Sequence, residues 1–142
     1  MNSGRDGHWL FRLTPVEWIR AAETELAAAR ENIGRRRTAL THARRAAGMA
    51  LNARLVAEAS RPSVHVEEVW GRSYLEHLRL LRTPGSELLG LGPERREDAS
   101  ILVELPLVPK EQLVRLGRGP DPEVQRALDA AERLLNECRP NG

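Results

Sequence analysis

The segment TPVEWIRAAETELAAARENI, residues 14–33, sets the architecture of this 142-residue chain. Thr14 is a residue type that caps helices, Pro15 suits the first helical position, and Glu17 completes a capping box. Behind this start, apolar residues recur three and four positions apart, at Ile19, Ala22, Leu26, Ala29 and Ile33. That spacing places them on one face of an amphipathic helix. The segment therefore predicts a long helix with a well-defined first turn.

Other segments carry comparable helical patterns. The second has a stripe of small and aliphatic residues, at Leu40, Ala43, Ala46, Ala47, Ala50, Leu51 and Leu55. Gly48 lies within it at a cost of roughly 1 kcal/mol relative to alanine, which predicts the close approach of a neighbouring helix. Near the C-terminus, Asp121, Pro122 and Glu123 repeat the order of cap, proline and acid. With Gly34 as the stop of the first helix, the expected helices cover residues 15–33, 36–59, 66–82 and 122–138.

The region before the last helix is less regular. Residues 94–104 read as a short helix that ends before Pro106; alternatively, the segment ILVELPLV, residues 101–108, is extended. Pro106 and Pro109 exclude a longer regular element there. The patterns together predict an all-α protein, a four-helix bundle with a short helical or irregular insertion before the last helix.

Length and composition favour a single helical-bundle domain over residues 14–139, preceded by a flexible N-terminal arm at residues 1–13. Aromatic residues make up only 4% of the chain, so the core must be built mainly from alanine and branched aliphatic side chains. Such a core favours closely packed helices. No apolar run is long enough for a signal peptide or a membrane span. The sequence therefore predicts a cytoplasmic protein with no membrane partner.

The cysteine and histidine content argues against several classes of site. Cys138 is the only cysteine, so no internal disulfide and no CxxC metal motif can form. The four histidines do not form HxxxH or HExxH patterns; they are His8, His42, His65 and His77. We therefore expect neither a metal site nor a bound cofactor.

The basic residues point towards phosphate. Lys110 is the only lysine among 22 basic residues, so the other 21 are arginines, whose guanidinium group binds oxyanions with two parallel hydrogen bonds. A GC-rich bacterial genome is the other explanation for such a composition. At the start of the second helix, where the helix dipole adds positive potential, the candidate phosphate- or nucleic-acid-binding residues are Arg35, Arg36, Arg37, Arg44 and Arg45. Alternatively, Glu23, Glu25 and Glu31 of the first helix neutralise this cluster.

The segment GRSYLEHLRLL, residues 71–81, contains the candidate catalytic pair, because Arg72 precedes His77 by five positions. Arg37 and His42 repeat that spacing. Histidine can act as an acid or a base near neutral pH, and arginine can hold a phosphate. Five positions on a straight helix place two side chains about 140° apart, so such a pair converges only at a helix start or across a dimer interface. The alternative is an ordinary amphipathic helix whose histidine is hydrogen-bonded to a neighbour.

Three segments, TPVEWIRAAETELAAAR, THARRAAGMALNARL and GRSYLEHLRLL, give the chain a resemblance to HEPN domains, a superfamily of small four- or five-helix bundles. It covers residues 14–82, and residues 122–138 by pattern alone. The resemblance implies one of two activities. Many members are metal-independent ribonucleases that carry an arginine, four to six residues and a histidine. Others bind a nucleotide or a protein partner without catalysis, including partners in nucleotidyltransferase toxin–antitoxin pairs.

Two departures from the family pattern favour the second activity. The family often places Asn, Asp or His directly after the arginine, where this chain has Ser73 and Thr38. The active motif also usually lies towards the C-terminal half of the domain. We therefore expect a non-catalytic binding or protein-interaction module, with an unknown protein or a second copy as partner and RNA or a nucleotide as candidate ligand. The alternative is a metal-independent dimeric ribonuclease, of the toxin or defence type, that uses Arg72 and His77.

Overall fold

The computed structural model describes residues 12–59, 74–81, 91–107 and 121–140. Within these ranges the chain forms five helices and no strand: α2 (Pro15–Glu31), α3 (Arg36–Ala59), α5 (Tyr74–Leu81), α6 (Glu94–Glu104) and α7 (Pro122–Cys138). The predicted all-α class is confirmed. The bounds of α3 and α7 agree with the predicted helices. The helix predicted over residues 66–82 is described only as α5, and the predicted arm lies outside the described residues except for residues 12 and 13.

The first turn of α2 forms as the sequence indicates, but its last turn does not. Thr14 Oγ1 accepts a hydrogen bond from the Glu17 backbone N–H at 3.2 Å, and Glu17 Oε1 accepts one from the Thr14 backbone N–H at 2.9 Å. The helix ends at Glu31, two residues before the predicted end. Asn32 caps it, because its Nδ2 donates to a carbonyl of the last turn at 2.8 Å. Gly34 therefore lies beyond the stop, and its φ is not left-handed.

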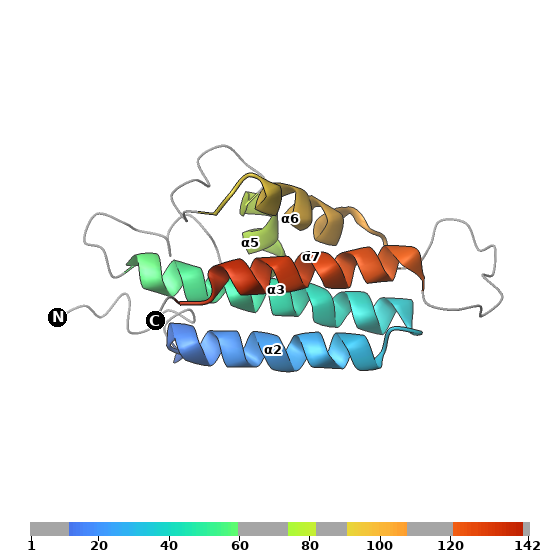
Figure 1. The fold of residues 1–142 in the computed structure, drawn as a ribbon, viewed down its shortest axis with the longest axis horizontal. Helices are drawn as coiled ribbons and strands as arrows, with labels where there is room; N and C mark the ends of the chain where they lie inside the picture. The colour runs from blue at the N-terminus through green and yellow to red at the C-terminus, as the bar shows by residue number, and fades with distance from the viewer. Residues whose placement is uncertain (1–11, 60–73, 82–90, 108–120, 141–142) are drawn as a thin grey trace.

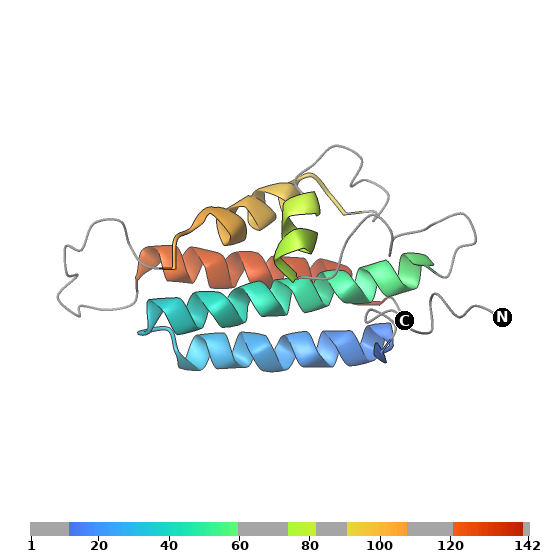
Figure 2. The same cartoon turned by 180° about the vertical axis from the view of Figure 1, so that it is seen from behind.

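The three long helices lie side by side, with α3 in contact with both α2 and α7, and the shorter α5 and α6 cover one side of α3 and α7 (Figures 1 and 2). α3 and α7 run in the same direction. Near their starts Arg36 pairs with Asp121, and further along Arg54 donates to the backbone carbonyl of Glu137. The arrangement is a group of three long helices that contact one another, with two short helices packed against α3 and α7.

The core follows the predicted apolar faces. Every residue of the predicted α3 stripe is buried. The apolar residues of α7 are buried as well; they include Val124, Ala127, Leu128, Ala131, Leu134, Leu135 and Cys138. Trp18 is buried near the start of α2, and Leu13 packs against the same core. In the part of the chain that the structure describes, no helix has the length and apolar character needed to cross a bilayer.

Gly48 is the point at which α5 meets α3. A Cβ atom on Gly48 would lie 2.8 Å from Tyr74 Cα and from Tyr74 Cδ1, and closer still to Tyr74 Cβ. Real Cβ atoms essentially never make contacts that close, so only glycine lets α5 sit at this depth. The predicted close approach of a helix at Gly48 is confirmed.

The insertion before the last helix is helical where it is described. α6 covers Glu94–Glu104, so the helical alternative is correct for these residues and the extended one is wrong. Asp98, which is buried, fixes α6 to α7 by accepting two hydrogen bonds from Arg133, at 3.0 and 2.8 Å.

Candidate functional site

The structure places one member of the predicted catalytic pair in the protein interior. Arg72 lies outside the described residues. His77, on α5, has a relative exposure of 0% and is one of the largest fully buried side chains in the described ranges. An imidazole enclosed in this way cannot contact a phosphodiester in the observed conformation.

Two of the five predicted phosphate-binding arginines hold helices together. Arg36 pairs at 2.8 Å with both Asp121 and Glu123 and donates to the Pro106 carbonyl at 3.0 Å, so only 11% of its side chain is exposed. Burial by itself lowers the pKa of Arg36, but the hydrogen bonds to Glu123 and Asp121 outweigh burial and raise the pKa above its usual value. Arg36 thereby links the starts of α3 and α7.

Arg44 has a similar structural position. Its guanidinium donates to backbone carbonyls at the C-terminal end of α6, with a distance of 2.7 Å from Nε to the Leu102 oxygen. These carbonyls have no partner inside their own helix, so the arginine satisfies them. Burial lowers the pKa of Arg44, and the charge of Arg79 on α5 acts in the same direction. Arg44 is therefore directed into the fold and not towards solvent.

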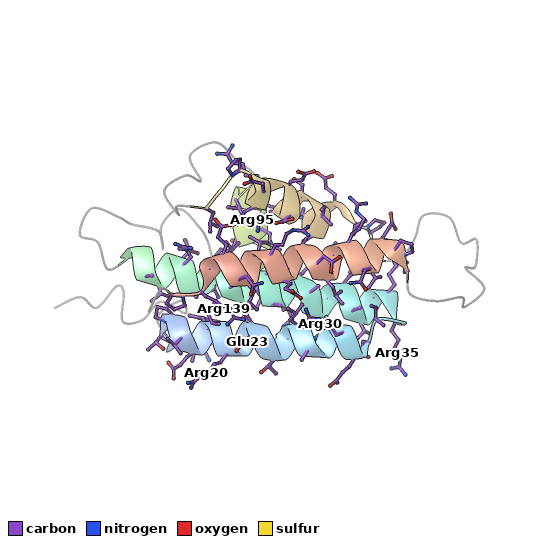
Figure 3. The ribbon with its side chains drawn as sticks, in the orientation of Figure 1. Arg20, Glu23, Arg30, Arg35, Arg95 and Arg139 are labelled. Carbon is purple, nitrogen blue, oxygen red and sulfur yellow. The ribbon has the colours of Figure 1, made fainter. Side chains whose placement is uncertain are left out.

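The other predicted arginines, Arg35, Arg37 and Arg45, are exposed. Figure 3 shows Arg35 at the end of the molecule where α2 leads into α3. Arg37, Thr41 and Arg45 follow one another at intervals of four residues, so they share one face of α3. We call these three residues the α3 row. The first turn of α3 contains no acidic residue, so no carboxylate of that turn offsets the positive end of its dipole.

His42 lies beside the α3 row and is held by a carboxylate of α2. Its Nδ1 is 2.8 Å from Glu25 Oε1, and Arg45 Nε is 3.5 Å from the same oxygen. We call Glu25, His42 and Arg45 the Glu25 cluster. The three side chains are 16%, 26% and 47% exposed, so the carboxylate lies deepest and the arginine outermost.

The alternative in which acidic residues of α2 neutralise the basic cluster is correct for one contact. Glu25 pairs with Arg45, whereas Glu23 pairs with Arg139 of α7 at 2.8 Å, on another face of α2. Arg35 and Arg37 form no ion pair with a described residue. The five predicted arginines are thus divided into two structural side chains, one partly neutralised side chain and two exposed ones.

Tyr74 lies near the Glu25 cluster. The pKa of its phenol is raised, mainly by burial; the charge of Arg45 opposes this effect and the charge of Glu25 adds to it. Since Tyr74 packs on Gly48, one turn along α3 from Arg45, the half-buried ring borders the α3 row. Sequence spacing cannot reveal Glu25 as a neighbour of His42, or Tyr74 as a neighbour of Gly48, because they come from α2 and α5.

A second surface feature lies between α2 and α7. It is an open groove of about 370 Å³, bordered by Leu26 and Leu135 and by two ion pairs, Arg30–Glu132 and Glu23–Arg139 (Figure 3). Each arginine at the groove is matched by a carboxylate, so the groove carries no excess charge. The groove therefore attracts an anionic ligand less strongly than the α3 row does.

Neither a metal site in the described residues nor a similarity to known proteins assigns a function to this surface. In the described ranges, no group of three or more His, Cys, Asp or Glu side chains is placed to hold a metal ion. A scan against protein-family models gives no match to the chain, and searches of curated proteins and of solved structures give none either.

Proposed function

We propose that this chain is a non-catalytic, HEPN-like binding module, located in the cytoplasm, that takes RNA on the α3 row. The observation that carries the proposal is the pair of exposed arginines, Arg37 and Arg45, on one face of α3. They are two turns apart, a rise of about 12 Å along the helix, so both can contact one extended strand. Guanidinium groups bind phosphate through paired hydrogen bonds, and Tyr74 offers a ring at the end of the row on which a base can stack.

The burial of His77 supports the absence of catalysis. A metal-independent ribonuclease needs an imidazole that reaches the 2′-hydroxyl or the leaving oxygen, and His77 has no exposed surface. The proposal therefore assigns His77 to the packing of α5 and not to RNA chemistry.

A ribonuclease that uses the other Arg/His pair is the second candidate. His42 is partly exposed, and a histidine whose Nδ1 is held by a carboxylate has its Nε2 available for proton transfer. If the chain cleaves RNA, the exposed Arg37 and the partly exposed His42 are better placed for it than the buried His77.

One mixture tests both candidates. A fluorescein-labelled single-stranded RNA is titrated with protein in EDTA, its anisotropy is recorded, and the same samples are run on a denaturing gel. We expect binding that weakens at least about fivefold in the Arg37→Gln/Arg45→Gln double variant, the effect of losing two charged hydrogen-bond donors. The control is Arg20→Gln, an exposed arginine of α2 that does not belong to the α3 row. Equal affinity of the wild type and the double variant contradicts the binding site, and cleavage that disappears in His42→Asn contradicts the non-catalytic assignment.

A further inference from the structure

The Glu25 carboxylate occupies the position that an anionic ligand of the Glu25 cluster would take. The other two side chains of the cluster approach the same atom, Glu25 Oε1, with His42 Nδ1 at 2.8 Å and Arg45 Nε at 3.5 Å. The carboxylate belongs to α2, whereas both partners belong to α3. The chain thus supplies its own anion to one end of the proposed binding surface.

The hold of Glu25 on its two partners is unequal. The distance to His42 is that of a short charge-assisted hydrogen bond, but the distance to Arg45 exceeds the usual 2.7–3.2 Å range for N–H···O bonds. Arg45 is half-exposed and makes no hydrogen bond in the described part of the chain. His42 Nε2 also has no partner there. The guanidinium of Arg45 therefore keeps donors that can turn to an incoming anion.

The charge on the ligand decides whether it can displace Glu25. A tethered carboxylate carries one negative charge and is always present, so a phosphodiester, also with one charge, gains no electrostatic advantage over it. A terminal phosphate monoester carries about −1.5 to −2 charges at neutral pH and offers three acceptor oxygens. We infer that Glu25 is an internal competitor at the Glu25 cluster, and that it makes the site selective for ligands that end in a phosphate monoester. This inference rests on the proposed binding of RNA to the α3 row and specifies which end group of the RNA is recognised.

Two RNAs of identical sequence test the inference, one with a 5′-phosphate and one with a 5′-hydroxyl. We expect the wild type to bind the phosphorylated RNA about tenfold more tightly, the effect of one added charge at a partly exposed site. In Glu25→Gln, both RNAs bind more tightly than to the wild type and the preference falls to about twofold. The amide oxygen of glutamine can still accept the hydrogen bond from His42, so we expect this variant to fold, which circular dichroism checks.

Glu23→Gln is the matched control, because it removes the same charge from α2 at a residue paired with Arg139 and not with the cluster. We expect it to change affinity by less than about twofold and to keep the preference for the phosphate. Arg45→Gln is the second variant, and it should bind both RNAs with equal, reduced affinity. If Glu25→Gln behaves as Glu23→Gln does, or binds more weakly than the wild type, the inference is overturned while the RNA-binding proposal stands.

A titration with inorganic phosphate tests the competition by Glu25 independently of RNA binding. The imidazole NMR signals of His42 are followed during phosphate titration of the wild type and of Glu25→Gln. If neither RNA binds but Glu25→Gln binds phosphate about tenfold more tightly than the wild type, RNA binding fails and the competition by Glu25 stands. If the phosphate affinities are equal, the competition is refuted as well.

Discussion

Burial of Cys138 at the end of α7 has a consequence for reactivity and for stability at high pH. The thiol is enclosed in the core, and burial raises its pKa to about 12 from an ordinary value of 9.0. A thiol must be deprotonated to react with disulfide reagents. Because the folded-state pKa lies above the unfolded one, its contribution to stability is complete below pH 9 and is lost as the pH rises from 9 towards 12.

We therefore predict that native Cys138 does not react with Ellman's reagent at pH 8, while urea-unfolded protein reacts fully. The free energy of unfolding of the wild type should also fall above pH 9, by at most about 1.4 kcal/mol per pH unit from this group. Cys138→Ala is the control, since it removes that component of the pH slope. Rapid labelling of the folded protein at pH 8 would refute the buried thiol.

The arginines of α3 show how much a residue type reveals about function. Arginine side chains suggested phosphate recognition, but the sequence pattern could not show which residues each arginine contacts in the fold. Arg36 contacts residues 70 and 85 positions away, and Arg44 contacts carbonyls 58 and 61 positions away. Three arginines within ten positions thus have different roles: Arg36 links α3 to α7, Arg44 caps the end of α6, and Arg45 is exposed to solvent. The sequence likewise allowed a catalytic or a packing role for His77, because its burial depends on contacts with residues distant in the sequence.

Helix starts were predictable because their signals are local, whereas contacts between helices were not. The capping box of α2, the Asp121–Pro122 start of α7 and the apolar stripes correctly gave the bounds of α3 and α7 and the start of α2. The end of α2 was wrong by two residues, because the Asn32 side chain competes for the last carbonyls before the chain reaches Gly34. The helical state of α6 could not be decided from its sequence, since it depends on Asp98 and on contacts with α3 and α7.

The contact between α3 and α5 predicts the effect of Gly48→Ala. Alanine favours a helix by about 1 kcal/mol over glycine, but its methyl group would collide with the backbone of Tyr74. Overpacking of this kind costs about 1–3 kcal/mol, so we expect a lower free energy of unfolding in urea. Gly34→Ala is the control, because no atom lies within 4 Å of its added Cβ. A Gly48→Ala protein more stable than Gly34→Ala would show that α5 does not pack closely on α3.

The contact between α6 and α7 predicts the effect of Asp98→Asn. The Asp98 side chain is only 4% exposed, lies 3.0 Å from Arg95 Nε and accepts two hydrogen bonds from Arg133. The hydrogen bond to Asp98 raises the pKa of Arg133. Replacing the carboxylate weakens charged hydrogen bonds, each worth about 1.5–3 kcal/mol, and we expect a loss of that order in urea unfolding. Asp129→Asn, an exposed change on α7, should stay within about 0.5 kcal/mol; equal stability of the two variants would contradict the anchoring role of Asp98.

The arrangement of all the helices explains why the α3 row is available to a ligand. α3 lies against α2 and α7 and supports α5 (Figure 2), so most of its faces are buried. Arg37, Thr41 and Arg45 are exposed and lie on what remains open. The sequence predicted an all-α bundle and named these arginines. It could not predict that Glu25 and Tyr74 would border them, because that neighbourhood exists only after three helices have packed.

The salt dependence of RNA binding tests this surface most directly. For a single strand, the logarithm of the binding constant falls with the logarithm of salt concentration by about 0.7 for each phosphate contacted. We predict that the slope decreases by about 1.4 in the Arg37→Gln/Arg45→Gln double variant and is unchanged in Arg20→Gln. A wild type without measurable binding, or equal slopes for the wild type and the double variant, would contradict recognition of RNA by the α3 row.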